Sequence, residues 1–189
     1  NTLSNDDVAG AITEAVPGAV NNVAGGTLTI NGYLGTGVDV TVGAGDTART
    51  IADGVNAVTD QTGVSARAVT YAKIDNVSAT GIYSLDLNGQ NTASAVTISA
   101  SITDTGDLTE LANAINGVSG KTGITAELSS DKSSITLKNA EGYDIHVANS
   151  PDSAGNFELT GLQEDGETEV GTAATLAKGA EATVGGNVI

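Results

Sequence analysis

The feature that most constrains this chain is an internal repeat. Residues 47–66 align without gaps with residues 107–126, and six of the twenty aligned pairs are identical. The identical pairs are Ala52/Ala112, Asn56/Asn116, Val58/Val118, Thr62/Thr122, Gly63/Gly123 and Ala66/Ala126. Self-similarity at a fixed spacing is the signature of repeated structural units. We therefore expect two related units in this chain of 189 residues.

Each copy contains an amphipathic helix. Apolar residues recur at spacings of three and four, which places them on one helical face. They are Ala48, Ile51, Ala52, Val55 and Val58 in the first copy, and Leu108, Leu111, Ala112, Ile115 and Val118 in the second. We expect Ile51, Val55, Leu111 and Ile115 to be buried, with each helix packed on its own small sheet.

Polar residues and glycines predict where these helices begin and end. Asp46 or Thr47 should cap the first helix, and Asp107, with Glu110 three residues on, should cap the second. Gly63 and Gly123 should end them, because glycine readily adopts the left-handed conformation found after helix termini.

Alternating apolar residues predict strands on both sides of each helix. Asn31-Gly32 and Asn88-Gly89 favour turns, although the loops that contain them look too long for a two-residue hairpin turn. The first copy alternates at Leu28, Ile30, then Val38, Val40, Val42, then Val64, Ala66, Ala68, with weaker candidates at Val69, Tyr71 and Ile74. The second alternates at Leu85, Leu87, then Val96, Ile98, Ala100, Ile102, then Ile124, Ala126, Leu128, followed by Ile135, Leu137 and by Tyr143, Ile145, Val147.

These patterns predict an α+β fold: two small β-β-α-β-type units with antiparallel sheets in an elongated arrangement. The expected organisation is an N-terminal stem or linker at 1–26, a first unit at 27–80, a second unit at 81–163 and a C-terminal stem or linker at 164–189. Leu3, Val8, Ile12 and Val16 would lie on a short helix that ends before Pro17. The chain begins at Asn1 without a signal peptide, and we interpret it as part of a longer protein whose two ends return to one side of the fold.

Composition excludes several classes of function. The chain has 23 acidic and seven basic residues, for a net charge of −16, and such a charge repels nucleic acid. It has no cysteine, which excludes disulfides and thiolate chemistry. No apolar run approaches the length of roughly 18 residues that a membrane helix needs.

Chemical motifs are sparse, and we predict no catalytic, cofactor-binding or metal-binding residues. His146 alternates with Ile145 and Val147, so it should point to solvent, and no nucleophile is spaced to pair with it. The acidic run Glu164–Glu169 could hold a cation but matches no EF-hand loop, so we interpret it as a flexible acidic linker. Asn76-Val77-Ser78 is a lone N-glycosylation sequon, interpreted as a chance match. The 25 glycines form no phosphate-binding motif.

The repeat resembles the flagellin IN motif. The resemblance rests on TLTING (27–32), VDVTV (38–42), the pattern D-x4-IADGVNAV (46–58) and TGVSA (62–66). In the second copy it rests on SLDLNG (84–89) and DLTELANAINGVSGKTGITAELS (107–129). The two copies cover roughly 100 residues, and their tandem arrangement makes the match more specific.

The resemblance implies a non-catalytic structural role without a cofactor: the surface-exposed outer region of a bacterial flagellin, extracellular and part of the filament. Its partners would be neighbouring flagellin subunits, joined through terminal helices that this chain lacks, and host receptors or antibodies, with no nucleic acid or membrane. The alternative is a surface binding or adhesin module, such as part of the filament cap or a hook-associated protein. In isolation the chain should be monomeric and indifferent to calcium.

Overall fold

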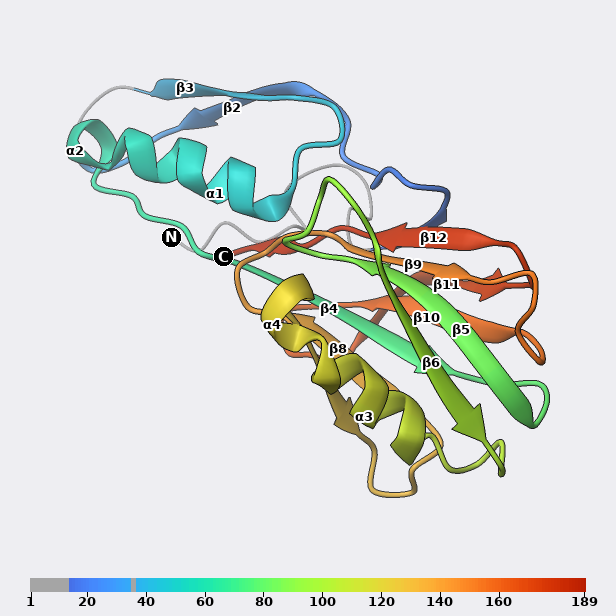
Figure 1. Ribbon diagram of the computed structural model, residues 1–189. Helices are drawn as coiled ribbons and strands as arrows, with labels where there is room; N and C mark the ends of the chain where they lie inside the picture. The colour runs from blue at the N-terminus through green and yellow to red at the C-terminus, as the bar shows by residue number, and fades with distance from the viewer. Residues whose placement is uncertain (1–13, 35–36) are drawn as a thin grey trace.

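The computed structural model describes residues 14–34 and 37–189. Most of them form a sandwich of two antiparallel sheets, and a smaller layer of two strands and two short helices lies against one end of it (Figure 1). All strand pairs are antiparallel in the described part of the chain. The α+β class is therefore confirmed. No helix among the described residues is long and apolar enough to span a membrane.

The first sheet of the sandwich has five strands. Their order is β1 (Ala15–Pro17), β12 (Glu181–Val184), β9 (Ile145–Asn149), β5 (Gly81–Asn88) and β6 (Val96–Ile102). The second sheet runs β11 (Glu169–Leu176), β10 (Phe157–Leu162), β4 (Ala68–Asp75), β8 (Ile135–Asn139) and β7 (Ile124–Leu128), with β13 (Asn187–Val188) paired to the start of β4.

Alternating side chains from both sheets fill the space between them. Leu85 and Leu87 of β5 and Ile145 and Val147 of β9 are all buried and belong to one core cluster with residues of β4, β8 and β10. Because aromatic residues are scarce, this core consists mainly of aliphatic side chains. Its two largest members, Tyr83 and Phe157, pack edge to face with ring centroids 6.4 Å apart.

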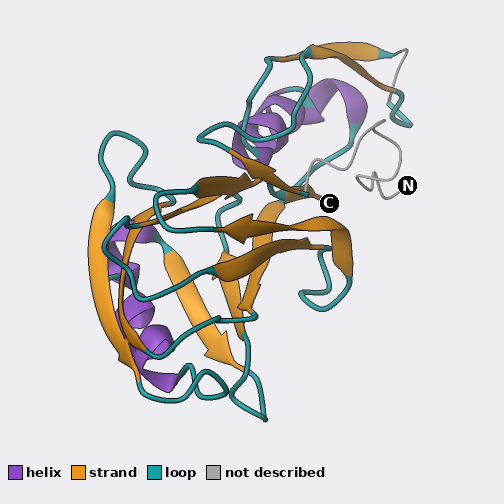
Figure 2. Ribbon diagram, turned by 90° about the vertical axis from the view of Figure 1, so that its right-hand side faces the viewer, coloured by secondary structure: helices purple, strands orange, loops and turns teal. Residues whose placement is uncertain are grey.

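Helix α3 (Thr109–Gly117) and the single turn α4 (Ser119–Thr122) close one edge of the sandwich. Leu111 and Ile115 are buried as predicted. However, α3 contacts β6 of the first sheet and β7 of the second, and Figure 2 shows it between the two layers. The expectation that this helix packs on a sheet of its own is therefore wrong, because its apolar face fills the gap where the two sheets diverge.

The smaller layer contains β2 (Gly26–Ile30), β3 (Val38–Val42), α1 (Ala48–Ala57) and α2 (Thr59–Thr62). Val55 is buried against Ile30 and Val40, as predicted for a helix on its own strand pair. Ile51, predicted to be buried, is only partly buried and packs at the margin of a small cluster formed by Ala48, Ala52 and Val188 of β13. Helix α1 thus sits between its own hairpin and the sandwich.

The two repeat copies are not separate bodies. After α2 the predicted strand at Val64 and Ala66 does not form, and the strand begins at Ala68 as β4. That strand belongs to the first copy, yet it lies in the middle of the second sheet between β10 and β8. The first copy therefore contributes a central strand to the sandwich formed by the second, and the sheets are shared.

The segments next to the repeats also join the sheets. Val16, predicted to be helical, lies in β1, which pairs with β12; Leu3, Val8 and Ile12 lie outside the described residues. The segment 164–189, expected as a stem or linker, contributes β11, β12 and β13. Tyr143 precedes β9 instead of lying in it.

Candidate functional site: the repeated helix end and the junction beside it

The strongest structural repetition lies at the helix ends. In both copies the helix is followed by one further turn, which ends at a glycine in the left-handed region: Gly63 with φ 70° and Gly123 with φ 68°. The threonine before each glycine is buried. The Thr62 hydroxyl donates to Val58 O at 3.0 Å and accepts from Val64 N–H at 3.1 Å. Thr122 makes the same two contacts with Val118 and Ile124.

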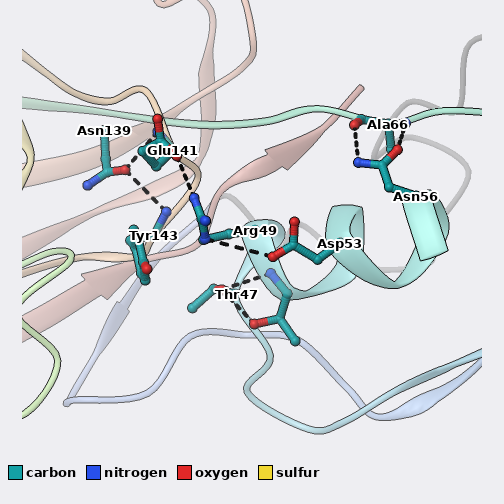
Figure 3. Close-up of polar contacts among 9 residues, drawn as sticks. Thr47, Arg49, Asp53, Asn56, Ala66, Asn139, Glu141 and Tyr143 are labelled. Carbon is teal, nitrogen blue, oxygen red and sulfur yellow. Dashed lines mark hydrogen bonds and ion pairs between the residues drawn. The ribbon is translucent and has the colours of Figure 1, made fainter.

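The repeated asparagines hold the chain that follows this turn. Asn56 donates its side-chain amide to Ala66 O and accepts from Ala66 N–H, both at 2.8 Å (Figure 3). Asn116 makes the same pair of bonds with Ala126, again at 2.8 Å. Each amide therefore mimics a neighbouring strand for one residue. Four of the six identical pairs, at the asparagine, threonine, glycine and second alanine positions, are explained by this one structure.

The two Asn-Gly pairs that lie in loops, Asn31-Gly32 and Asn88-Gly89, also contact this helix end. A Cβ on Gly32 would lie 1.7 Å from Thr62 O, and one on Gly89 would lie 2.2 Å from Thr122 O. Neither distance permits a side chain, so glycine is required because the loop backbone crosses directly over the helix end. This close approach, and not a two-residue hairpin turn, is the role of these glycines.

The predicted helix starts are confirmed in part. The Thr47 hydroxyl accepts from Thr50 N–H at 3.2 Å and caps α1. Helix α3 begins at Thr109, and Asp107 accepts both the N–H and the hydroxyl of that residue, which lowers the pKa of the Asp107 carboxyl. Among the described residues Glu110 does not complete a capping box.

The first turn of α1 binds the sandwich through Arg49. Its guanidinium lies 2.5 Å from Glu141 Oε2, 3.8 Å from Asp53 Oδ2 and 5.2 Å from the ring centre of Tyr143 (Figure 3). The Arg49 N–H also donates to Gly142 O at 3.0 Å. Since these contacts are solvent-exposed, the ion pairs add little stability individually. Their geometry instead orients the smaller layer on the loop before β9.

A second link, between Asn21 and Asp144, joins the smaller layer to the sandwich. The buried Asn21 amide donates to Asp144 Oδ2 at 2.7 Å and also to the carbonyl oxygens of Gly45 and Asp46. The other carboxyl oxygen of Asp144 is buried without a hydrogen-bond partner in the described part of the chain. Burial raises the pKa of Asp144 from 3.8 to about 7, and the bond from Asn21 opposes this only in part.

A pocket of about 240 Å³ opens beside this link. It is lined by Ala19, Thr47, Asn88, Gly89, Thr92, Asp144, His146 and Thr183. As predicted, His146 points away from the core that contains Ile145 and Val147, but it is not solvated: its side chain is only 14% exposed. Strand β12 covers it, so the prediction failed because the sequence does not show which strand lies beside β9.

The hydrogen bonds of His146 argue against a catalytic dyad. Its Nδ1 lies 2.9 Å from Thr183 Oγ1, and its Nε2 lies 3.3 Å from Glu181 Oε2. The Thr183 hydroxyl donates to Gly18 O at 2.7 Å, so it accepts from His146 Nδ1–H. Because the hydroxyl proton is bound to a carbonyl oxygen and Nδ1 carries a proton itself, His146 cannot activate Thr183 as a nucleophile.

The acidic run at 164–169 forms a turn in place of the expected flexible linker. Gln163 N–H donates to Thr168 O at 2.8 Å, which closes the loop between β10 and β11. Asp165 accepts from the Thr168 hydroxyl and from the N–H groups of Thr168 and Glu167, and these bonds lower the pKa of its carboxyl. No group of three or more metal-ligating side chains occurs in residues 14–34 and 37–189.

Sequence reasoning found the helix ends but missed the junction. Asn56 and Asn116 were marked by their identity in the two copies. Arg49 was only weakly indicated by the sequence: the chain has seven basic and 23 acidic residues, so each basic residue is a candidate for an ion pair. Asn21 and Asp144 had none, because they are 123 positions apart and meet only in the folded chain.

Comparison with known families identifies the repeated element. The family model described as the flagellin hook IN motif matches residues 27–80 and 84–141, together more than half of the chain. No curated protein sequence matches the chain significantly. The first matched segment contains the Asn-Gly pair, α1, α2 and most of their contacts, and the second contains the equivalent elements up to the loop that binds Arg49. With two tandem copies of this motif, the chain belongs to the flagellin hook IN motif family.

Proposed function

We propose that this chain is a non-catalytic structural part of the bacterial flagellum, exposed on the outer surface of the filament. The observation that carries the proposal is the helix end that is built twice from the same residues and matched twice by the family model. The match to the flagellin hook IN motif supports a structural role. The position on the outer surface of the filament is our proposal.

The use of the motif residues supports a scaffold in preference to a binding site. The side chains of Asn56, Asn116, Thr62 and Thr122 are all bonded to backbone groups of their own unit. Groups committed in this way are not free to bind a substrate. The motif therefore determines the path of the main chain. Any specific recognition of another molecule must come from surfaces that differ between the two copies.

The arrangement of strands supports insertion in a longer subunit. Strand β1 lies beside β12 in the first sheet, so the first described strand and one of the last are neighbours. A domain that enters and leaves at neighbouring points can be inserted into another structure without disturbing it. We propose repeat units at 27–80 and 81–163 that share the two sheets, and flanking segments at 1–26 and 164–189 whose strands pair into the same sheets before the chain leads to the remainder of the subunit. Asn1 lies outside the described residues.

The surface charge fits a position exposed to solvent. A net charge of −16 opposes association of the isolated chain. We propose that the chain alone is monomeric and that it meets neighbouring subunits only in the assembled filament, together with any antibody or host receptor that reaches the surface.

Immunogold electron microscopy of intact flagella, with an antibody raised against this chain, tests the proposal. Labelling along the whole filament is the expected result. Labelling confined to the distal tip, or to the junction of hook and filament, would replace it with the alternative of a cap or hook-associated protein. The exposed Tyr33 and Leu34, 85% and 53% accessible, favour that alternative, because apolar surface residues suit a binding module.

A further inference from the structure

The chain contains three Asn-Gly pairs, and the structure treats them differently. They are Asn31-Gly32, Asn88-Gly89 and Asn116-Gly117. Asn-Gly is the dipeptide in which the backbone nitrogen of the second residue most easily reaches the side-chain amide of the first, because glycine has no Cβ to obstruct it. Local structure then decides which pair can react.

Helix and hydrogen bonds protect the pair at 116–117. Both residues lie in α3, where the backbone conformation is fixed. Both atoms of the Asn116 amide are bonded to Ala126. To react, Asn116 would have to release these two bonds, and the last turn of the helix would have to unwind.

A dedicated side chain protects the pair at 88–89. Asn91 Oδ1 accepts from Gly89 N–H at 2.8 Å, and Asn88 donates its amide to Asn91 O at 2.9 Å. Asn91 in turn donates to Leu87 O and Ser94 O. The attacking nitrogen and the amide that would be attacked are therefore both held by the same residue.

The first copy lacks this clamp. Leu34 occupies the position that corresponds to Asn91, three residues after the asparagine in each copy, and it is 53% exposed. Asn31 is exposed, and neither its amide nor Gly32 N–H has a hydrogen-bond partner within residues 14–34 and 37–189. The contact of the glycine with the helix end occurs in both copies, so it does not distinguish them.

We propose that Asn31-Gly32 is a site of spontaneous deamidation, while the other two Asn-Gly pairs are protected. Gly32 N, losing its proton to solvent, forms a bond to Asn31 Cγ, and the Cγ–Nδ2 bond breaks to release ammonia. Water then opens the five-membered imide. Cleavage of the new N–Cγ bond leaves aspartate, and cleavage of the original peptide bond leaves isoaspartate. Either product adds one negative charge to an exposed loop, and isoaspartate also lengthens the main chain there.

Peptide mapping by tandem mass spectrometry tests the proposal in the intact chain. The folded protein is incubated at mildly alkaline pH, and the amide-to-acid mass gain is followed at each of the three asparagines. Asn31 should convert at least about tenfold faster than Asn88 and Asn116, since about 1.4 kcal/mol of local opening already gives that ratio. In denaturant the three rates should converge, because only the fold distinguishes the pairs.

Two variants complete the test. Asn91→Leu, which copies the first unit into the second, should raise the rate at Asn88 while Asn31 in the same molecule serves as the reference. Asn31→Gln should abolish the fast conversion. Equal rates at the three sites in the folded wild-type chain, or faster conversion at Asn88 or Asn116 than at Asn31, would overturn the proposal without recourse to any variant.

Discussion

Asp144 is an ionisable group where the smaller layer meets the sandwich. Its replacement by asparagine should show by how much its negative charge lowers the free energy of unfolding. Burial raises its folded-state pKa to about 7, against 3.8 in the unfolded chain. A group with a raised acid pKa binds its proton more tightly when folded. Its carboxylate therefore destabilises the fold, and the penalty grows as pH rises from the unfolded pKa to the folded one.

The size of the effect follows from the shift. A difference of about three pKa units corresponds to about 4 kcal/mol at full ionisation. Because Asp144 keeps some contact with solvent and accepts a bond from Asn21, we expect about 2–4 kcal/mol.

Urea unfolding of wild type and Asp144→Asn, followed by circular dichroism, measures the effect. At about pH 8 the variant should be more stable by that amount. At about pH 4 most of the gain should vanish, because the folded carboxyl is then protonated and the unfolded carboxyl, with its pKa of 3.8, is itself partly protonated. Asp165→Asn is the matched control with the opposite sign. The pKa of Asp165 is lowered by its bonds to Thr168, so this variant should lose stability at neutral pH. A difference between wild type and Asp144→Asn that does not change with pH would refute the reasoning.

Three further outcomes test the fold and the solution behaviour. Leu111→Ala should cost about 2–5 kcal/mol of unfolding free energy in urea titrations, since Leu111 is 1% exposed; a loss below about 1 kcal/mol would contradict the packing of α3 between the sheets. Gly89→Ala should lower the thermal midpoint, because its Cβ would lie 2.2 Å from Thr122 O, whereas Gly117→Ala, with open space around it, should leave the midpoint unchanged or raise it; equal effects would show that the close approach is unimportant. Light scattering at physiological salt should give a monomer with and without calcium, and a calcium-induced oligomer would return attention to the acidic turn at 164–169.

The helices and their ends could be predicted from the sequence because interactions between residues close in the chain determine them. The spacing of Leu111 and Ile115 required a helix with one buried face, and the structure buries both. Gly63 and Gly123 had to end the helices because few other residues tolerate their positive φ. The identity of Asn56 and Asn116 marked a shared contact, although the sequence did not show that this contact was a paired bond to one backbone residue.

The partners of each element were decided only in the tertiary structure. Period-two alternation states that one face of a strand is buried, but not which sheet buries it. Strand β4 therefore looked like part of a first, separate unit, and it became the central strand of the second sheet. The same limit explains why His146 was placed in solvent: its exposure depended on β12, which lies 35 or more residues later in the chain.

The sequence by itself thus determined the family, the two helix ends and the alternation of the strands, since each depends on residues close together in the chain. The junction was decided by the tertiary structure alone. Arg49 meets Glu141, and Asn21 meets Asp144, across separations of 92 and 123 residues. Such contacts form only where the packing of two hydrophobic layers has already brought their rims together. Their polar side chains carry no periodic signal, so no reading of neighbouring residues could have paired them.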